Sequence, residues 1–427
     1  MSRSPHLTVD IIALGEGGDG LAETERGRIY IADALPGDRV KIRVRRGNGG
    51  VPRGEILERL ASGDSRAEPL CRHFGRCGGC AVQHVGQETY IGWKRNLVAS
   101  AMARRGLDVA VLGEPVPGAP GRRRRARLFV QMTGRGPVIG FREARSHRIV
   151  PVTECPVLHA DIVGILAELP DLFRHLLPAG AKAELAVTLT DGGLDMTVLA
   201  ADEPDLTQRE SLASFAEIHD VARISWGLFG DAASAEPVVR RRAATVTFCS
   251  VPVEPPPDAF LQPTAEGEAA LRARIEEALA GASRVVDLYS GCGAFALPLA
   301  SGGKHVLAID SAADHVDALD AAARSGGFGE MVQIEARDLH HRPLEADELK
   351  GLDAVVLDPP RAGASRQAAI IAGADIPVVA YASCDPRSFA RDARLLCDGG
   401  YRLVWVTPVD QFLFTPHVEL VGIFRKV

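Results

Sequence analysis

Apolar runs of strand length recur through the C-terminal part of the chain, and stretches with a helical spacing of apolar residues separate them. Continuous apolar runs are typical of strands that are buried on both faces of a parallel sheet. Seven such strands are predicted, over residues 284–289, 305–310, 331–338, 352–361, 377–384, 401–406 and 419–424. Their alternation with helices predicts an α/β domain with one open, Rossmann-like sheet.

The N-terminal part follows a different pattern. Residues 7–12, 28–31 and 39–45 alternate apolar and polar side chains, and Gly-rich turns separate them. This alternation predicts strands with one buried face, which together form a small OB-like β-barrel.

A central region lies between the barrel and the sheet. Apolar residues recur at helical steps over residues 84–112, and two alternating runs predict a hairpin over residues 183–199. Three consecutive prolines end this region. The predicted domains are therefore residues 1–62, the barrel; 63–255, a central α+β domain; and 256–427, the seven-stranded sheet.

Composition narrows the class of protein. Apolar residues make up 46% and charged residues 24% of the 427 positions, as in ordinary globular proteins. No apolar run approaches the roughly 18 residues that a membrane span needs, and the first residues lack the apolar core of a signal peptide. We therefore expect a cytoplasmic protein without membrane contact, and a monomer as the default.

The net charge of −6 is unevenly distributed. Residues 61–150 carry 16 Lys and Arg against 6 Asp and Glu, whereas residues 151–280 carry 9 against 21. A basic segment inside an acidic protein favours a localised surface for a polyanion. Within residues 61–150, the runs 122–127 and 140–148 carry many of these cations, and we expect them to contact phosphate groups, with a solvated basic face as the alternative.

Four of the eight cysteines form a pattern. Cys71, Cys77 and Cys80 are close in sequence, and Cys155 follows much later, directly before a proline. Zinc tetrathiolate sites usually show two CxxC pairs, and this chain has one. The spacing and the Cys-Pro pair favour a [4Fe–4S] cluster. A zinc site, a redox CxxC and plain structural thiols remain alternatives.

A further cysteine ends the fifth predicted strand. The apolar run 377–382 leads to Cys384, and an Asp-Pro break follows. Ligands of open α/β sheets lie at the carboxyl ends of the strands. Cys384 is therefore placed to act as a nucleophile, although free cysteines are also among the most buried structural residues.

The first two strands of the sheet carry a nucleotide-type pattern. Asp287 ends the first strand, Gly291 and Gly293 form the turn after it, and Asp310 ends the second strand, where it can bind ribose hydroxyls. The third glycine of the dinucleotide fingerprint is absent. The pattern therefore suits S-adenosylmethionine better than NAD.

Three further motifs complete a resemblance. They are Asp358-Pro-Pro-Arg361, Ser383-Cys384-Asp385-Pro386 and Pro416-His417-Val418-Glu419, and Leu35-Pro-Gly-Asp-Arg-Val40 matches the barrel. Together they resemble the RNA uridine-5-methyltransferase family, specifically the iron–sulfur type that forms 5-methyluridine in 23S ribosomal RNA. The resemblance covers nearly the whole chain. It implies an N-terminal TRAM-like barrel, a central RNA-binding domain built around the cluster, and a class I methyltransferase sheet.

The resemblance also implies roles for individual residues. Cys384 matches the nucleophile and Glu419 the base that removes the C5 proton. The positions that match contacts to S-adenosylmethionine are Gln262, Tyr289, Asp310, Asp338 and Asp358. The cluster ligands would be Cys71, Cys77, Cys80 and Cys155. The chain departs from the family pattern at Ala294, where the family often has Asn, and at Asp385, which replaces the usual Asn.

The implied chemistry needs these residue types. Uracil C5 is too weak a nucleophile to take a methyl group unaided, but a thiolate that adds at C6 converts C5 into an enolate carbon. A base must then remove the C5 proton so that the thiol can leave. Cysteine combines high nucleophilicity with good leaving ability. Arg361 would either orient Asp358 or hold the uracil.

The expected partner is RNA, with the target uridine flipped out of a loop of 23S rRNA. A transfer RNA substrate is the first alternative, and a non-catalytic RNA-binding or assembly protein is the second. An amino-methyltransferase is disfavoured because Arg361 stands where that class has an aromatic residue, and a radical enzyme because its CxxxCxxC spacing is absent.

Overall fold

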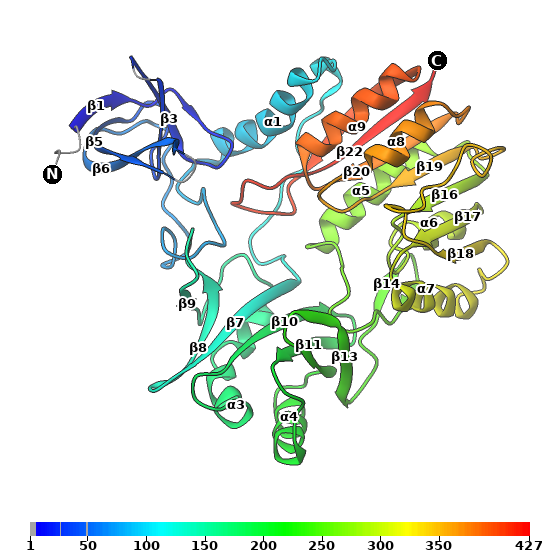
Figure 1. Cartoon of the computed structure of the whole chain (residues 1–427), viewed down its shortest axis with the longest axis horizontal. Helices are drawn as coiled ribbons and strands as arrows, with labels where there is room; N and C mark the ends of the chain where they lie inside the picture. The colour runs from blue at the N-terminus through cyan, green and yellow to red at the C-terminus, as the bar shows by residue number, and fades with distance from the viewer. Residues whose placement is uncertain (1–5, 26, 48–49) are drawn as a thin grey trace.

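The computed structural model describes residues 6–25, 27–47 and 50–427. Figure 1 shows three groups of elements: a small N-terminal sheet, a central sheet with helices on one side, and a larger C-terminal sheet with helices on both faces. The fold is therefore multidomain and mixes helices with strands, as predicted. None of the described helices combines the length and the apolar character that crossing a membrane requires.

The N-terminal sheet has six strands in the order β1-β5-β6-β4-β3-β2. They are β1 (His6–Asp10), β2 (Ala13–Leu14), β3 (Gly20–Thr24), β4 (Gly27–Ile31), β5 (Arg39–Arg46) and β6 (Pro52–Ala61). Alternate side chains such as Val9, Ile31 and Ile42 fill its core. The three predicted strands are present, but no described pairing joins the edge strands, so the closed OB-like, TRAM-like barrel stays a prediction.

The central sheet has seven strands in the order β13-β12-β11-β10-β7-β8-β9. They are β7 (Arg125–Thr133), β8 (Gly136–Arg142), β9 (Ile149–Pro151), β10 (Lys182–Thr190), β11 (Gly193–Ala200), β12 (Arg223–Leu228) and β13 (Asp231–Arg240). Its helices are α2 (Ala160–Ile165), α3 (Leu169–Leu176) and α4 (Leu206–Ile218). The β10–β11 pair confirms the predicted hairpin. A short ribbon of β14 (Val246–Phe248) and β15 (Val251–Val253) leads out of this region.

The C-terminal sheet has the seven predicted strands in the order β18-β17-β16-β19-β20-β22-β21. They are β16 (Arg284–Leu288), β17 (His305–Asp310), β18 (Val332–Ala336), β19 (Ala354–Leu357), β20 (Val378–Ser383), β21 (Tyr401–Val409) and β22 (Glu419–Lys426). All pair in parallel except β22, which runs antiparallel to both neighbours.

Helices cover both faces of this sheet. They are α5 (Ala265–Ala278), α6 (Ala296–Ser301), α7 (Ala313–Ser325), α8 (Ser365–Ala372) and α9 (Pro386–Asp398). Residues of α5, α6 and α7 share one apolar core with the sheet, and residues of α8 and α9 share the other. Both faces of the sheet are therefore buried, which explains the continuous apolar runs in the sequence.

Helix α1 (Gln87–Arg104) comes early in the chain but packs on the C-terminal sheet. Figure 1 shows it between the N-terminal sheet and α9. Val98 and Met102 are fully buried in the core that α8 and α9 cover, and Tyr90 and Trp93 are also buried. The apolar stripe predicted from the sequence therefore faces a core, and it connects the N-terminal region to the sheet that carries the candidate site.

Replacement of Gly422 by alanine tests the packing of β22. The added Cβ would lie 2.5 Å from Cζ of Phe389, whose ring is fully buried and has no room to move. We expect the free energy of unfolding to fall by about 1–3 kcal/mol. Gly92→Ala on α1, where an added Cβ meets nothing within 4 Å, is the matched control and should be neutral or stabilising. Thermal unfolding of the full chain measures both, and an unchanged midpoint for Gly422→Ala would contradict the packing argument.

Candidate active site

Cys384 and Glu419 meet through the pairing of β20 with β22. The register places Ser383 opposite Leu420, so the next residue on each side of the ladder is Cys384 and Glu419. Cys384 then enters a sharp turn, because Asp385 caps α9 by accepting the backbone N–H groups of Arg387 and Ser388. Residues 35 positions apart in sequence therefore stand at one edge of the sheet.

A chain of side-chain hydrogen bonds crosses this edge. Gln262 donates to Asp358 Oδ2 over 3.0 Å, and Gln411 donates to Gln262 Oε1 over 2.6 Å and to Glu419 Oε2 over 3.1 Å. Three of these residues were predicted site residues. Gln411 was missed, because an amide two residues past a strand carries no sequence signal of its own.

Acidic side chains are concentrated at this edge. Glu419 is 2% exposed, and its Oε1 has no hydrogen-bond partner among the described residues. Burial and the neighbouring Asp358 raise the pKa of Glu419 well above its usual range, although Gln411 opposes the shift. Burial raises the pKa of Asp358 to about 7. Such a site favours a positively charged ligand, which would relieve the repulsion between carboxylates.

The thiol of Cys384 shares this environment. Burial, then the charges of Glu419 and Asp358, raise its pKa to about 12. The protein by itself therefore holds Cys384 as a thiol near neutral pH, and formation of the nucleophilic thiolate requires a change in the charges around it.

The turn after β16 forms the other side of the site. Tyr289 and Gly293 have positive φ values of 66° and 93°, and an added Cβ on Gly293 would lie 2.4 Å from Leu319. Asp310 fixes the turn, because its Oδ2 accepts the N–H of Gly291 and its Oδ1 that of Ala312. The carboxyl ends of β16, β17 and β19 thus enclose one polar region.

Asp287, the last acid before this turn, was not among the predicted site residues. It is fully buried, and no described side chain donates a hydrogen bond to its carboxylate. Burial, with Asp358 and Asp310 nearby, raises its pKa well above the usual range. It adds a third acid with a raised pKa to the same edge of the sheet.

Asp338 lies at the margin of this region. Its side chain is exposed, and its Oδ1 accepts the N–H groups of His340 and His341. It is still close enough to Tyr289 to contribute to the raised pKa of that phenol, which burial, Asp392, Asp338 and Asp310 bring to about 12.

Arg361 pairs with Asp385 over 3.3 Å, and its side chain is mostly exposed. Arg361 therefore contacts Asp385, whereas one of its two expected roles was to orient Asp358. The Asp385 carboxylate instead joins the cap of α9 to an exposed cation beside Cys384.

The basic run 122–127 is largely engaged inside the protein. Arg124 is mostly buried, where it donates to the carbonyl of Gln262 and pairs with Glu268 over 2.6 Å. Arg125 donates to the carbonyl of Leu261, and Arg127 pairs with Glu184 and Asp258. The prediction of phosphate contact is therefore wrong for Arg124 and Arg125, because their donors hold the segment that presents Gln262.

The four patterned cysteines lie together. Cys71, Cys77, Cys80 and Cys155 line one cavity of about 420 Å³, and burial with the other three thiols nearby raises the pKa of Cys80 to about 12. Cys155, distant in sequence, thus joins the other three as expected. Within the described residues, no group of three or more His, Cys, Asp or Glu side chains has an arrangement that could hold a metal ion.

Comparisons with known proteins agree on one kind of enzyme. The family model described as tRNA (Uracil-5-)-methyltransferase matches residues 251–427. An uncharacterized RNA methyltransferase of Brucella suis is 39% identical over 100% of this chain and 99% of its own length. The 23S rRNA (uracil(1939)-C(5))-methyltransferase of Photorhabdus laumondii is 29% identical, over 98% of this chain and 96% of its own.

The fold also matches a solved structure over almost its whole length. The Pyrococcus abyssi tRNA (uracil-54, C5)-methyltransferase, in complex with S-adenosyl-L-homocysteine, superposes with a TM-score of 0.76 at 23% identity. The match covers 98% of this chain and 100% of that one. At this identity the likeness shows that the two chains share a fold.

The raised pKa of Cys384 predicts its reactivity. Because that pKa is about 12, the thiolate fraction should rise about tenfold per pH unit from pH 7 to pH 10, without a plateau. Alkylation by iodoacetamide, followed by mass spectrometry of the peptide that contains Cys384, measures this rise. Free cysteine, with a pKa of about 8.5, is the reference and should reach its plateau inside the range. A plateau for Cys384 below pH 10 would contradict the assigned environment.

Proposed function

The chain belongs to the RNA uracil-5-methyltransferase family, and on that premise we propose that it methylates C5 of a uridine in 23S rRNA through a covalent adduct of Cys384. An S-adenosylmethionine-dependent RNA uracil-5-methyltransferase is what the relatives and the fold support as its class. The observation that carries the mechanism is the adjacent placement of Cys384 and Glu419 at the end of the β20–β22 ladder.

The proposed reaction balances as follows. The Cys384 thiolate forms a bond to C6, and C5 becomes an enolate carbon that attacks the methyl group of the sulfonium, which releases S-adenosylhomocysteine. Glu419 then removes the C5 proton, the C5–C6 double bond re-forms, and the C6–S bond breaks. The Cys384 thiolate is regenerated, and one proton is left on Glu419.

The positive charge of the sulfonium would help Glu419 and Cys384 to ionise. Glu419 must be a carboxylate to accept a proton, and Cys384 must be a thiolate to add to C6, yet burial opposes both charged forms. A cationic co-substrate beside Asp358 favours ionisation of both groups by direct attraction. Gln262, Tyr289, Asp310, Asp338 and Asp358 are the proposed contacts of this co-substrate.

Support for an rRNA substrate comes from the full-length similarity to the Photorhabdus laumondii enzyme and from the four-cysteine pattern. A tRNA substrate is the second candidate, because the matching family model carries a tRNA name. For either RNA, the turn of Arg142, Arg145 and His147 is a proposed phosphate contact, since these residues line a surface cavity next to the cysteine loop.

We also propose that Cys71, Cys77, Cys80 and Cys155 hold a [4Fe–4S] cluster. Each iron of such a cluster binds one thiolate, so four thiols around one cavity fit it, whereas a single ion needs ligands that converge on one point. A bound cluster would supply cross-links between loops rather than a redox step. Residues 412, 413 and 415–417 line the same cavity, so the cluster would also support the loop before Glu419.

Methyl transfer from labelled S-adenosylmethionine tests the reaction. Wild-type protein should place label in 5-methyluridine of 23S rRNA, Cys384→Ala should place none, and Glu419→Gln should accumulate a methylated RNA–protein adduct because the last proton stays on C5. Cys397→Ala, a half-buried cysteine on α9, is the matched control and should keep activity. Label in tRNA alone would support the tRNA alternative, and bound co-substrate without any label would support a non-catalytic RNA-binding protein.

Iron and sulfide analysis tests the cluster. Protein purified without oxygen should contain about four irons and four sulfides per chain. Cys155→Ser should lower both, whereas Cys249→Ser, outside the cavity, should not. One zinc per chain without sulfide would instead identify a zinc site.

A further inference from the structure

A lysine on α1 reaches into the candidate site from outside the C-terminal domain. Lys94 is 1% exposed, and its ammonium group lies 2.8 Å from Oδ1 of Asp410, itself 3% exposed. It also donates to the carbonyls of Phe412, over 3.1 Å, and His417. The ammonium group thus makes two hydrogen bonds and one ion pair, all within one short segment.

Tyr90, one helical turn earlier, forms hydrogen bonds with the same segment. Its hydroxyl donates to Asp410 Oδ2 over 2.5 Å and accepts the backbone N–H of Phe414 over 2.9 Å. Residues four apart on a helix share one face, so Tyr90 and Lys94 act together. From α1, these two side chains hold the segment 410–417 at four of its residues.

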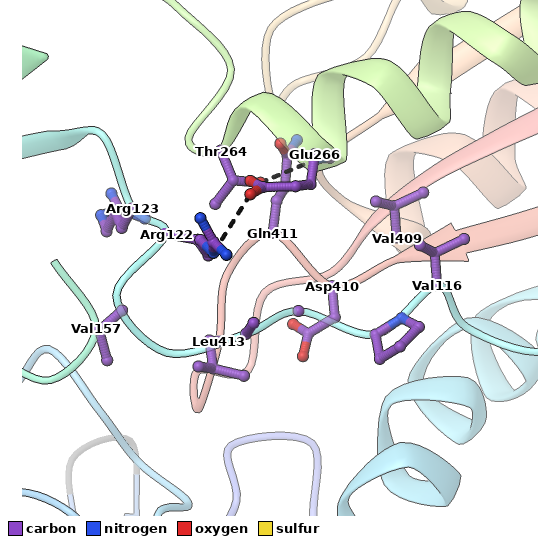
Figure 2. Close-up of a pocket in the computed structure, with 14 residues that line it drawn as sticks. Val116, Arg122, Arg123, Val157, Thr264, Glu266, Val409, Asp410, Gln411 and Leu413 are labelled. Atoms are coloured by element: carbon purple, nitrogen blue, oxygen red, sulfur yellow. Dashed lines mark hydrogen bonds and ion pairs between the residues drawn. The ribbon is translucent and has the colours of Figure 1, made fainter. Parts of the chain in front are cut away.

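The segment 410–417 joins β21 to β22 and so leads directly to Glu419. Figure 2 shows that Asp410 and Gln411 point in different directions, with Gln411 directed toward the start of α5. Asp410 thus contacts α1 while its neighbour Gln411 contacts Gln262 and Glu419. The position that Lys94 imposes on Asp410 is passed to the Glu419 carboxylate through one peptide unit and one hydrogen bond.

A buried ion pair contributes little to the free energy of unfolding. The cost of removing both charges from water often equals or exceeds their attraction, and apolar side chains of similar volume frequently serve as well. Hydrogen bonds of fixed direction, however, hold a loop in one place, which apolar contacts do more loosely. The contacts of Lys94 are therefore suited to holding the segment 410–417 in one fixed position.

We propose that Lys94 is a positioning residue for the base of the reaction, acting through the segment 410–417 and Gln411 on the Glu419 carboxylate. The inference rests on the proposed role of Glu419. Loss of Lys94 should then slow removal of the C5 proton more than methyl transfer, because Cys384 lies between β20 and α9, whereas the hydrogen bonds and ion pair of Lys94 go to the segment 410–417.

The experiment follows methyl-labelled S-adenosylmethionine with a 23S rRNA transcript in single-turnover reactions. Label that stays on the protein after nuclease digestion reports the methylated adduct, and label in free 5-methyluridine reports completed turnover. For Lys94→Met we expect methyl transfer within about threefold of wild type and a rise of about tenfold or more in the ratio of adduct to product, since a general base contributes about 10²–10⁴.

Lys304→Met is the matched control. Lys304 is also buried and also donates to a main-chain carbonyl, that of Ala282, but it lies before β17 at the opposite edge of the sheet. It should leave the adduct ratio unchanged. Equal slowing of both steps in Lys94→Met, or an unchanged ratio, would overturn the proposal.

Glu419→Gln separates the two possible failures. If Glu419→Gln accumulates adduct and Lys94→Met does not, only the positioning role is wrong. If Glu419→Gln does not accumulate adduct, the assignment of Glu419 as the base is wrong. The double variant Lys94→Met/Asp410→Asn removes both charges, so Asp410 is not left as an unpaired buried charge. It is used in place of Lys94→Met if the single variant does not fold. If neither variant folds, as judged by thermal unfolding and co-substrate binding, Lys94 is a structural residue and the proposal fails.

Discussion

The antiparallel insertion of β22 between β20 and β21 is the constraint on which the candidate site depends. In this register the end of β20 and the start of β22 coincide, so a thiol and a carboxylate are brought together by backbone hydrogen bonds rather than by a flexible loop. A shift of one residue would turn Glu419 to the other face of the sheet, because side chains alternate along a strand. The packing of Gly422 against Phe389 makes such a shift costly.

The electrostatics of the site follow from that geometry. Asp287, Asp358 and Glu419 are brought to one edge of a sheet that is covered on both faces, so water cannot screen their charges. A carboxylate in such a place without a cation is unfavourable, which is why the pKa values of all three groups are raised. This arrangement is a reason to expect a cationic co-substrate, and it raises the pKa of the Cys384 thiol in the protein alone.

Contacts from the other domains converge on the same few residues. Arg124 and Arg125 of the central domain hold the main chain around Gln262, while Tyr90 and Lys94 hold the segment around Gln411. Gln262 and Gln411 bond to each other and link Asp358 to Glu419. The N-terminal region joins through Glu16, which pairs with Arg104 of α1 and Arg387 of α9. The domains that are proposed to bind RNA therefore also support the groups proposed to do the chemistry.

The sequence alone determined the elements and much of the site. Apolar periodicity located all seven strands of the C-terminal sheet, because a strand buried on both faces must be apolar throughout, and the motifs around Cys384 and Glu419 marked the residues that now stand together. Only the tertiary structure decided the rest. Gln411 and Lys94 carry no local pattern, since their importance comes from partners up to 323 residues away. Arg124 and Arg125 were misjudged for the same reason: composition reports charge, but whether a guanidinium meets phosphate, a carboxylate or a main-chain carbonyl depends on what the fold places beside it.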